Sequence, residues 1–159
     1  MTTRGGKICA LGIILAMLAW ALLAYRMFAG APTVTARDGR QAIVLAPSER
    51  ALILTEMRAF LGGTQRITHA LGVRDMKTVA TAARALGRAA THEAPPELIA
   101  KLPLPFKQLG FSVHDDFDQI ALDAESFGDP QHTLEQLDGV MQKCVACHAT
   151  YQFQAQTRP

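Results

Sequence analysis

The feature that most constrains this chain is an uncharged apolar run close to its start. Residues 8–25 form 18 successive residues without a charge, and Arg4 and Lys7 stand just before them. Such a run reaches the lower end of the length that crosses a membrane as a helix. Small residues follow at positions 29–31, which completes the layout of a secretory signal. We therefore expect residues 1–31 to be a signal peptide or a membrane anchor outside the folded domain.

Two features favour a retained anchor over a cleaved signal. The apolar run is longer than the usual signal core, and Pro32 would directly follow a cut after Ala31. Cys9 lies inside the run and is interpreted as a small apolar residue facing lipid. Residues 32–47 follow without periodicity and contain several breakers, so they are predicted to be a linker.

The remaining residues, 48–159, are predicted to form one domain. The chain is 49% apolar, which is enough for a real core. Beyond Ala31 there are 13 Lys and Arg residues against 14 Asp and Glu residues, a net charge of −1. Domains that bind nucleic acid usually carry a basic surface, so this balance argues against nucleic acid as a partner.

Four segments of this domain repeat apolar residues at helical spacing. Each begins at a residue type that caps helices well, and the expected starts are Ser48, Asp75, Ser112 and Asp129. The expected ends of the first three are Gly72, about Ala90 and Gly128. Between the second and third helices we predict a long connection with one short helical turn, interrupted by Pro95, Pro96, Pro103 and Pro105. No segment alternates as a strand would, so the predicted fold is all-α, an antiparallel up-down four-helix bundle.

The last predicted helix ends in a motif with specific chemistry. Cys144, Cys147 and His148 form a C-x-x-C-H sequence. At this spacing each thiol can form a thioether with a haem vinyl group, and the adjacent histidine can bind the iron. A thioredoxin-type pair would need a strand before the motif, and structural zinc would need a second cysteine pair. We therefore predict one covalently bound haem c. Because bacteria attach it outside the cytoplasm, we expect a periplasmic chain, free or tethered to the inner membrane.

The apolar stripe of the last helix is predicted to carry the motif toward the interior. Its members recur at three- and four-residue steps and are Leu134, Leu137, Met141, Cys144, His148 and Tyr151. In an up-down bundle the haem would then lie at the end where the first helix begins. The same end should hold Arg50, Leu54, Met57, Arg88, Lys101 and His114.

With the bundle and the C-terminal motif in view, residues 48–153 resemble the class II cytochromes c, which are cytochrome c-prime and its low-spin relatives. The resemblance is carried by residues 50–57, Arg-Ala-Leu-Ile-Leu-Thr-Glu-Met, and residues 143–148, Lys-Cys-Val-Ala-Cys-His. It implies that Arg50 contacts a haem propionate. It also implies one of two iron sites: a sixth position left empty under an apolar roof, matched by Leu54, or a methionine ligand from the first helix.

Met57 is the candidate for that methionine, because it lies one turn beyond Leu54 in the same stripe and thioethers pair with imidazole in low-spin cytochromes. Its other interpretation is a methionine that fills the core. His114 is a further candidate, although beside Asp115 it is interpreted first as an exposed or capping histidine. The sequence thus leaves three states of the sixth position open: Met57, no ligand, or His114.

The predicted function is electron transfer with redox partner proteins, and the membrane is a partner if the N-terminal segment is retained. The alternative that the resemblance implies is binding of NO or CO at an open sixth position. An enzyme such as a peroxidase would need a distal acid–base pair, and the sequence organises none, so we predict no enzymatic activity. A homodimer through the first two helices is compatible with their small residues.

Overall fold

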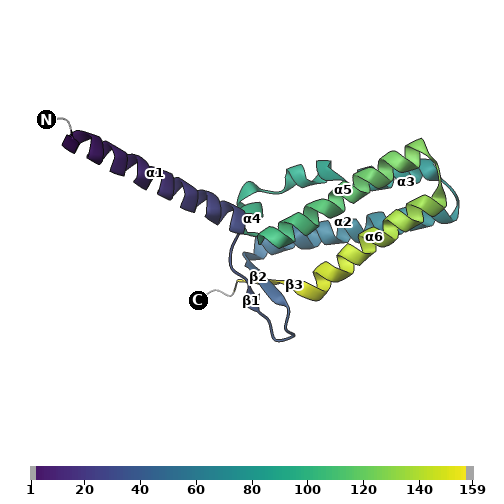
Figure 1. Ribbon diagram of the computed structural model, residues 1–159. Helices are drawn as coiled ribbons and strands as arrows, with labels where there is room; N and C mark the ends of the chain where they lie inside the picture. Colours follow the sequence, from purple (N-terminus) through teal and green to yellow (C-terminus); the bar gives the residue numbers. More distant parts are fainter. Residues whose placement is uncertain (1–2, 157–159) are drawn as a thin grey trace.

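The computed structural model describes residues 3–156, which fold into a mostly helical protein with one small sheet (Figure 1). The helices are α1 Thr3–Ala29, α2 Pro47–Gly72, α3 Met76–Arg84, α4 Pro96–Lys101, α5 Leu104–Ser126 and α6 Pro130–Thr150. The strands are β1 Val34–Thr35, β2 Gln41–Leu45 and β3 Tyr151–Ala155. A 3₁₀ helix, Arg88–Glu93, lies between α3 and α4.

Helix α1 extends away from the rest of the protein (Figure 1). Its segment Ile8–Tyr25 is long and apolar enough to cross a membrane, a property that signal sequences near an N-terminus share. Just beyond the helix, the Ala31 N–H donates to the Lys101 carbonyl of α4 at 3.0 Å. Gly30 has a φ of +75°, and a Cβ there would lie 2.1 Å from the Leu102 carbonyl oxygen. Glycine is therefore required where the chain passes from α1 onto α4.

Helices α2, α3, α5 and α6 share the larger of two apolar clusters. Its members include Ile67 of α2, Val79 of α3, Phe117 and Ile120 of α5, and Val140 of α6. Helix α3 packs against α2 and α5, and α6 packs against α5. The buried face of α3 consists mostly of alanines, and these small side chains let it approach both neighbours closely.

The second cluster lies at the end of the molecule where α2 begins and α6 ends (Figure 1). Its buried members come from β2, α2, α4 and α5, and they are Ile43, Leu45, Ile53, Leu98, Leu102 and Phe106. Strand β2 pairs in parallel with β3, from Gln41 beside Tyr151 to Leu45 beside Ala155, and antiparallel with β1. The sheet therefore ties the segment after α1 to the C-terminal strand.

This sheet corrects two expectations from the sequence. The predicted linker, residues 32–47, contains β1 and β2, and the β2 side chains of Ala42, Ile43 and Leu45 are buried. The domain is therefore not all-α. The pairing is parallel and joins Gln41 to a residue 110 positions later, since 151 − 41 = 110. A parallel pair needs no local turn, so the sequence around β2 carried no sign of its partner.

The third predicted helix begins earlier than expected. Helix α5 starts at Leu104 rather than Ser112, because Pro105 lies in its first turn, where the missing N–H of proline costs nothing. The short turn expected in the proline-rich connection is present as α4. The predicted caps Asp75 and Asp129 are confirmed, since each side chain accepts a backbone N–H in the first turn of its helix.

The second predicted helix is shorter than expected. Helix α3 ends at Arg84 rather than near Ala90, and the 3₁₀ helix follows. The Arg88 N–H donates to the Asp118 carboxylate of α5 at 2.8 Å. This contact between elements distant in sequence competes with continuation of the helix, and local apolar spacing does not reveal it.

Candidate functional site

The C-x-x-C-H motif lies at the junction of α6 and the sheet. Cys144, Cys147 and His148 occupy the last two turns of α6, and β3 begins at Tyr151. The Tyr151 N–H donates to the Cys147 carbonyl. Arg40, in the turn between β1 and β2, donates from Nη1 to the His148 carbonyl at 3.2 Å. The backbone at the end of the motif is therefore bound both by the first residue of β3 and by Arg40 of the turn between β1 and β2.

The two thiols face different apolar clusters. Cys144 is half-buried against the larger cluster, and Cys147 is half-buried against the second cluster. Both cysteines are free thiols. Burial raises the pKa of Cys144, and burial together with the adjacent Cys144 raises the pKa of Cys147. Both thiols are therefore protonated near neutral pH, whereas a thioredoxin-type pair depends on a lowered thiol pKa.

The buried face of α6 differs from the predicted stripe. Its buried residues are Thr133, Leu137 and Val140. Three members of the predicted stripe are exposed, namely Leu134, Met141 and His148. The expectation that His148 faces the interior together with Cys144 is therefore wrong for this structure. Thr133 can occupy a core position because its hydroxyl donates to the Asp129 carbonyl at 3.1 Å, which a count of apolar residues overlooks.

Helix α2 brings Met57 to the same cluster as Cys147. Met57 is half-buried against that cluster, and Leu54 is also half-buried. The Arg50 side chain donates from Nε to the Phe153 carbonyl of β3 at 3.0 Å. The start of α2 is therefore fixed to the strand that follows the motif, and this contact was not expected from the sequence.

Two other cations expected near the motif form pairs within the fold. Lys101 of α4 pairs with Glu49 of α2 at 2.5 Å. Arg88 donates twice to Asp115 of α5, at 2.6 and 2.8 Å, and its guanidinium lies 4.8 Å from the Phe111 ring centre. These pairs position α4 and the 3₁₀ helix rather than supplying free positive charge.

His114 differs most from its expected position. It lies in the middle of α5 and is buried. Its Nδ1 is 2.7 Å from the Leu86 carbonyl oxygen, and its Nε2 is 3.2 Å from Oε1 of Glu56. Its ring centre lies 4.9 Å from that of Phe60. The expectation of an exposed or capping histidine is wrong, because α5 starts about two turns earlier than predicted.

These contacts favour a charged imidazole at His114. Burial by itself lowers the pKa of His114, but the hydrogen bonds to the Glu56 carboxylate and the Leu86 carbonyl outweigh it, so the pKa is raised on balance. In the charged ring both nitrogens donate and neither keeps a lone pair for iron. The arrangement therefore engages both ring nitrogens of His114 within the fold.

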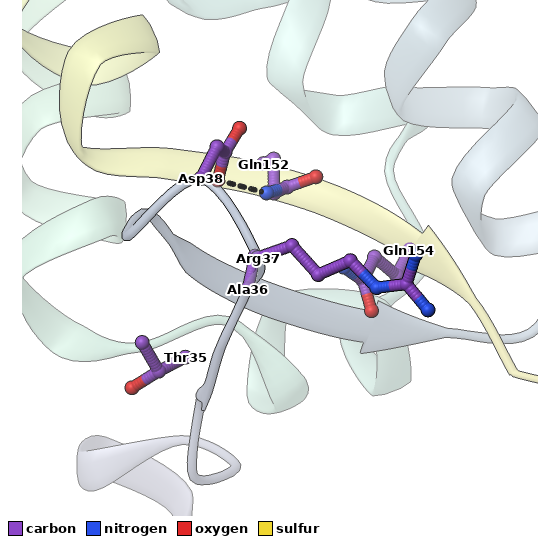
Figure 2. Close-up of a pocket in the computed structure, with 6 residues that line it drawn as sticks. All are labelled: Thr35, Ala36, Arg37, Asp38, Gln152 and Gln154. Atoms are coloured by element: carbon purple, nitrogen blue, oxygen red, sulfur yellow. Dashed lines mark hydrogen bonds between the residues drawn. The ribbon is translucent and has the colours of Figure 1, made fainter.

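Sequence reasoning missed the polar contacts between the hairpin and β3. Asp38 pairs with Arg40 at 2.7 Å. It also accepts a hydrogen bond from Gln152 at 2.8 Å (Figure 2). A signal for this turn was present, because Asp-Gly is a preferred hairpin pair and Gly39 has a φ of +84°. A polar pocket beside β3 is lined by Thr35, Ala36, Arg37, Asp38, Gln152 and Gln154.

Comparisons with known proteins leave the family open. No protein-family model, no curated protein and no solved structure matches the chain. Within residues 3–156, no group of three or more His, Cys, Asp and Glu side chains could hold a metal ion. A functional hypothesis therefore rests on the motif and its surroundings.

Proposed function

We propose that this chain is an exported c-type cytochrome with one haem, which carries electrons in the periplasm or at the outer face of the inner membrane. The observation that carries the proposal is the C-x-x-C-H motif at the end of α6, whose two thiols are each half-buried against an apolar cluster. This role is that of a carrier for redox partner proteins rather than of an enzyme.

The residues around the motif suit a haem. Cys144 and Cys147 would hold it through thioethers, and His148 would bind its iron. The thiols face apolar surroundings, which match an apolar macrocycle, and the exposed His148 ring is accessible. A bound haem supplies one-electron redox chemistry at its iron. The role of this chain's own residues is to hold, orient and shield that group.

Met57 is our proposed sixth ligand. It packs in the same cluster as Cys147, and a thioether opposite an imidazole is a low-spin arrangement that suits electron transfer. Arg50 lies about two turns before Met57, and its Nε is bound to the Phe153 carbonyl, so its terminal nitrogens would be the donors for a propionate. If the sixth position were open, Leu54 would be its roof and the protein would bind NO or CO.

The proposal extends to architecture and location. Helices α2, α3, α5 and α6 would form the antiparallel four-helix bundle of the class II cytochromes c, with the hairpin as an addition at the motif end. Helix α1 would anchor the chain. It leads through Ala31 to α4, which shares its cluster with Cys147. An anchored chain would therefore keep its haem end close to the membrane and at high effective concentration for redox partners there.

The primary test is spectroscopy of the full chain, produced in a host that matures c-type cytochromes. Wild-type protein should carry one haem that remains attached after denaturation, and C144A/C147A should carry none. The ferrous wild type should give sharp low-spin bands that do not change when CO is added. Wild-type protein that matures without covalent haem would refute the proposal.

Met57→Ala separates electron transfer from gas binding. Met57 and Met76 are both half-buried methionines packed against an apolar cluster, so Met76→Ala is the matched control. We expect Met57→Ala to become high-spin and to bind CO, while Met76→Ala keeps the wild-type spectrum. A wild-type spectrum that already shifts with CO would instead establish an open position and make gas binding the function.

A further inference from the structure

Arg40 joins the N-terminal hairpin to the helix end that carries the motif. Its Nη1 is 3.2 Å from the His148 carbonyl oxygen and 3.5 Å from that of Tyr151. Its Nε and Nη2 donate to Oδ2 of Asp38 at 2.8 and 2.7 Å. The other oxygen of Asp38 accepts from Gln152 of β3 at 2.8 Å (Figure 2). One arginine–aspartate pair thus contacts the chain on both sides of Thr150, where α6 ends.

The position of Arg40 meets a specific need of α6. The last four carbonyls of a helix have no partner within it, and positive charge is favourable at that end. Two of those carbonyls belong to Cys147 and His148. The Tyr151 N–H binds the first, and Arg40 binds the second. Without Arg40, the carbonyl of the proposed axial ligand would lose its partner in the protein.

The hairpin itself is firmly seated. Strand β2 pairs with β3 over the whole length of both strands, and the Gln156 N–H donates to the Leu45 carbonyl at 2.8 Å. Ile43 and Leu45 are buried in the same cluster that Cys147 packs against. Arg40 directly precedes β2, so the pairing and burial of this strand fix the backbone from which its side chain extends.

We propose that Arg40 is a positioning residue for His148: held by Asp38, it fixes the last turn of α6 and with it the imidazole presented to haem iron. This inference rests on the proposed function. The segment before the helices thereby becomes part of the haem site rather than a connection to the membrane anchor. A guanidinium suits the task because three of its nitrogens reach two carbonyls and a carboxylate together, which a lysine ammonium cannot do.

Arg37 provides a matched control three positions earlier in the same turn. Its side chain extends along β3 toward Gln154 rather than toward the end of α6 (Figure 2). Within the described residues, it forms neither a hydrogen bond nor an ion pair. Arg37→Gln removes the same charge from the same turn while leaving the contact to His148 in place.

The experiment compares wild type, Arg40→Gln, Arg40→Lys and Arg37→Gln as full-length haem-loaded proteins. The first measurement is hydrogen exchange of the backbone amides in residues 148–155. The second is the ferric electron paramagnetic resonance spectrum and the reduction potential, which report the axial ligands. Loss of a hydrogen bond from a charged donor predicts at least about tenfold faster exchange in Arg40→Gln. We also expect a broadened ferric signal and a shifted potential, with Arg40→Lys between Arg40→Gln and wild type.

Each outcome bears on one of the two proposals. Faster exchange with an unchanged ferric signal and potential would overturn the positioning role, because Arg40 would then only stabilise the sheet. An effect of Arg37→Gln equal to that of Arg40→Gln would overturn it too, by showing a response to charge alone. Wild-type protein without covalent haem would refute the proposed function itself. If Arg40→Gln does not fold, Asp38→Asn, which loosens the guanidinium without removing it, should give the same changes at smaller size.

Discussion

Replacing His114 by leucine should destabilise the protein, and most strongly at acidic pH. The His114 side chain is 6% exposed and links three parts of the fold: its own helix α5, Glu56 of α2 and the Leu86 carbonyl after α3. Leucine keeps the apolar contacts, including those near Phe60, but offers no donor. The variant therefore tests the two hydrogen bonds rather than the packing.

The magnitude follows from the two partners left behind. The Leu86 carbonyl would be left without a partner, which costs about 1–3 kcal/mol. The bond to the Glu56 carboxylate is worth about 1.5–3 kcal/mol, at the low end here because Glu56 is 34% exposed and regains water. Leucine returns roughly 1 kcal/mol through added apolar burial. We expect a net loss of about 1.5–3.5 kcal/mol in the free energy of unfolding.

The pH dependence has a definite sign. The pKa of His114 is raised in the folded state above its ordinary value of about 6.5. The folded protein then binds this proton more tightly than the unfolded chain does. The stabilisation is fully present below about pH 6.5 and is lost as pH rises through the folded-state pKa. The difference between wild type and His114→Leu should therefore shrink as the solution becomes alkaline.

Urea unfolding of the full chain in detergent, followed by circular dichroism across this pH range, measures the effect. With a slope of about 2 kcal/mol per M, the midpoint should fall by about 1–2 M at acidic pH. His132→Leu is the control: His132 also lies 3.2 Å from a carboxylate, that of Asp123, but its side chain is 43% exposed. An exposed pair is worth about 0–1 kcal/mol. A loss in His114→Leu that stays constant or grows with pH would refute this reasoning, as would an equal loss in the control.

Two paired substitutions test the packing. Gly63→Ala should cost about 1–3 kcal/mol, because its Cβ would lie 2.3 Å from Leu86 Cδ1, whereas Gly139→Ala meets nothing within 4 Å and should stabilise by up to about 1 kcal/mol. Urea midpoints should move in opposite directions, and a shared direction would contradict the contact. Ile43→Ala should cost about 2–5 kcal/mol, while Val44→Ala, 40% exposed on the same strand, should cost much less by thermal unfolding. Equal losses would mean that β2 is not seated in the cluster.

Local chemistry explains which features could be predicted from the sequence. Asp75 and Asp129 cap helices through contacts two or three residues away, so their roles follow from their neighbours. The spacing of Cys144 and Cys147 is a local property as well, and so is the apolar run of α1. Each of these features is determined by residues that are close together in the sequence, so it can be recognised without knowledge of the fold.

Features that depend on distant partners were missed or misplaced. His114 was expected at a helix start, but its burial depends on Glu56 of α2 and on Leu86 in the turn after α3. The inward face of α6 was only partly predicted: Leu137 is buried as expected, but Thr133 and Val140 take the places expected for Leu134 and Met141. Thr133 can fill a core position because its hydroxyl is bound locally. The apolar spacing of the sequence is the same whether His114 is buried or exposed and whichever face of α6 is buried. Periodicity alone therefore could not predict either feature.

The β1–β2 hairpin shows both a feature that the local sequence predicts and a feature that depends on a distant partner. The Asp38-Gly39 pair is a local signal for a turn, but nothing near it identifies β3 as the strand that β2 joins. Such non-local parallel pairing forms only after the ends of a long segment have been brought together, at an entropic cost that the helical core must first offset. Arg40 can therefore reach the His148 carbonyl only once the helices have brought the two ends of the domain into contact. The chemistry of the motif follows from the spacing of adjacent residues in the sequence. Its final geometry, in contrast, depends on the contact between Arg40 and His148, which are more than one hundred positions apart.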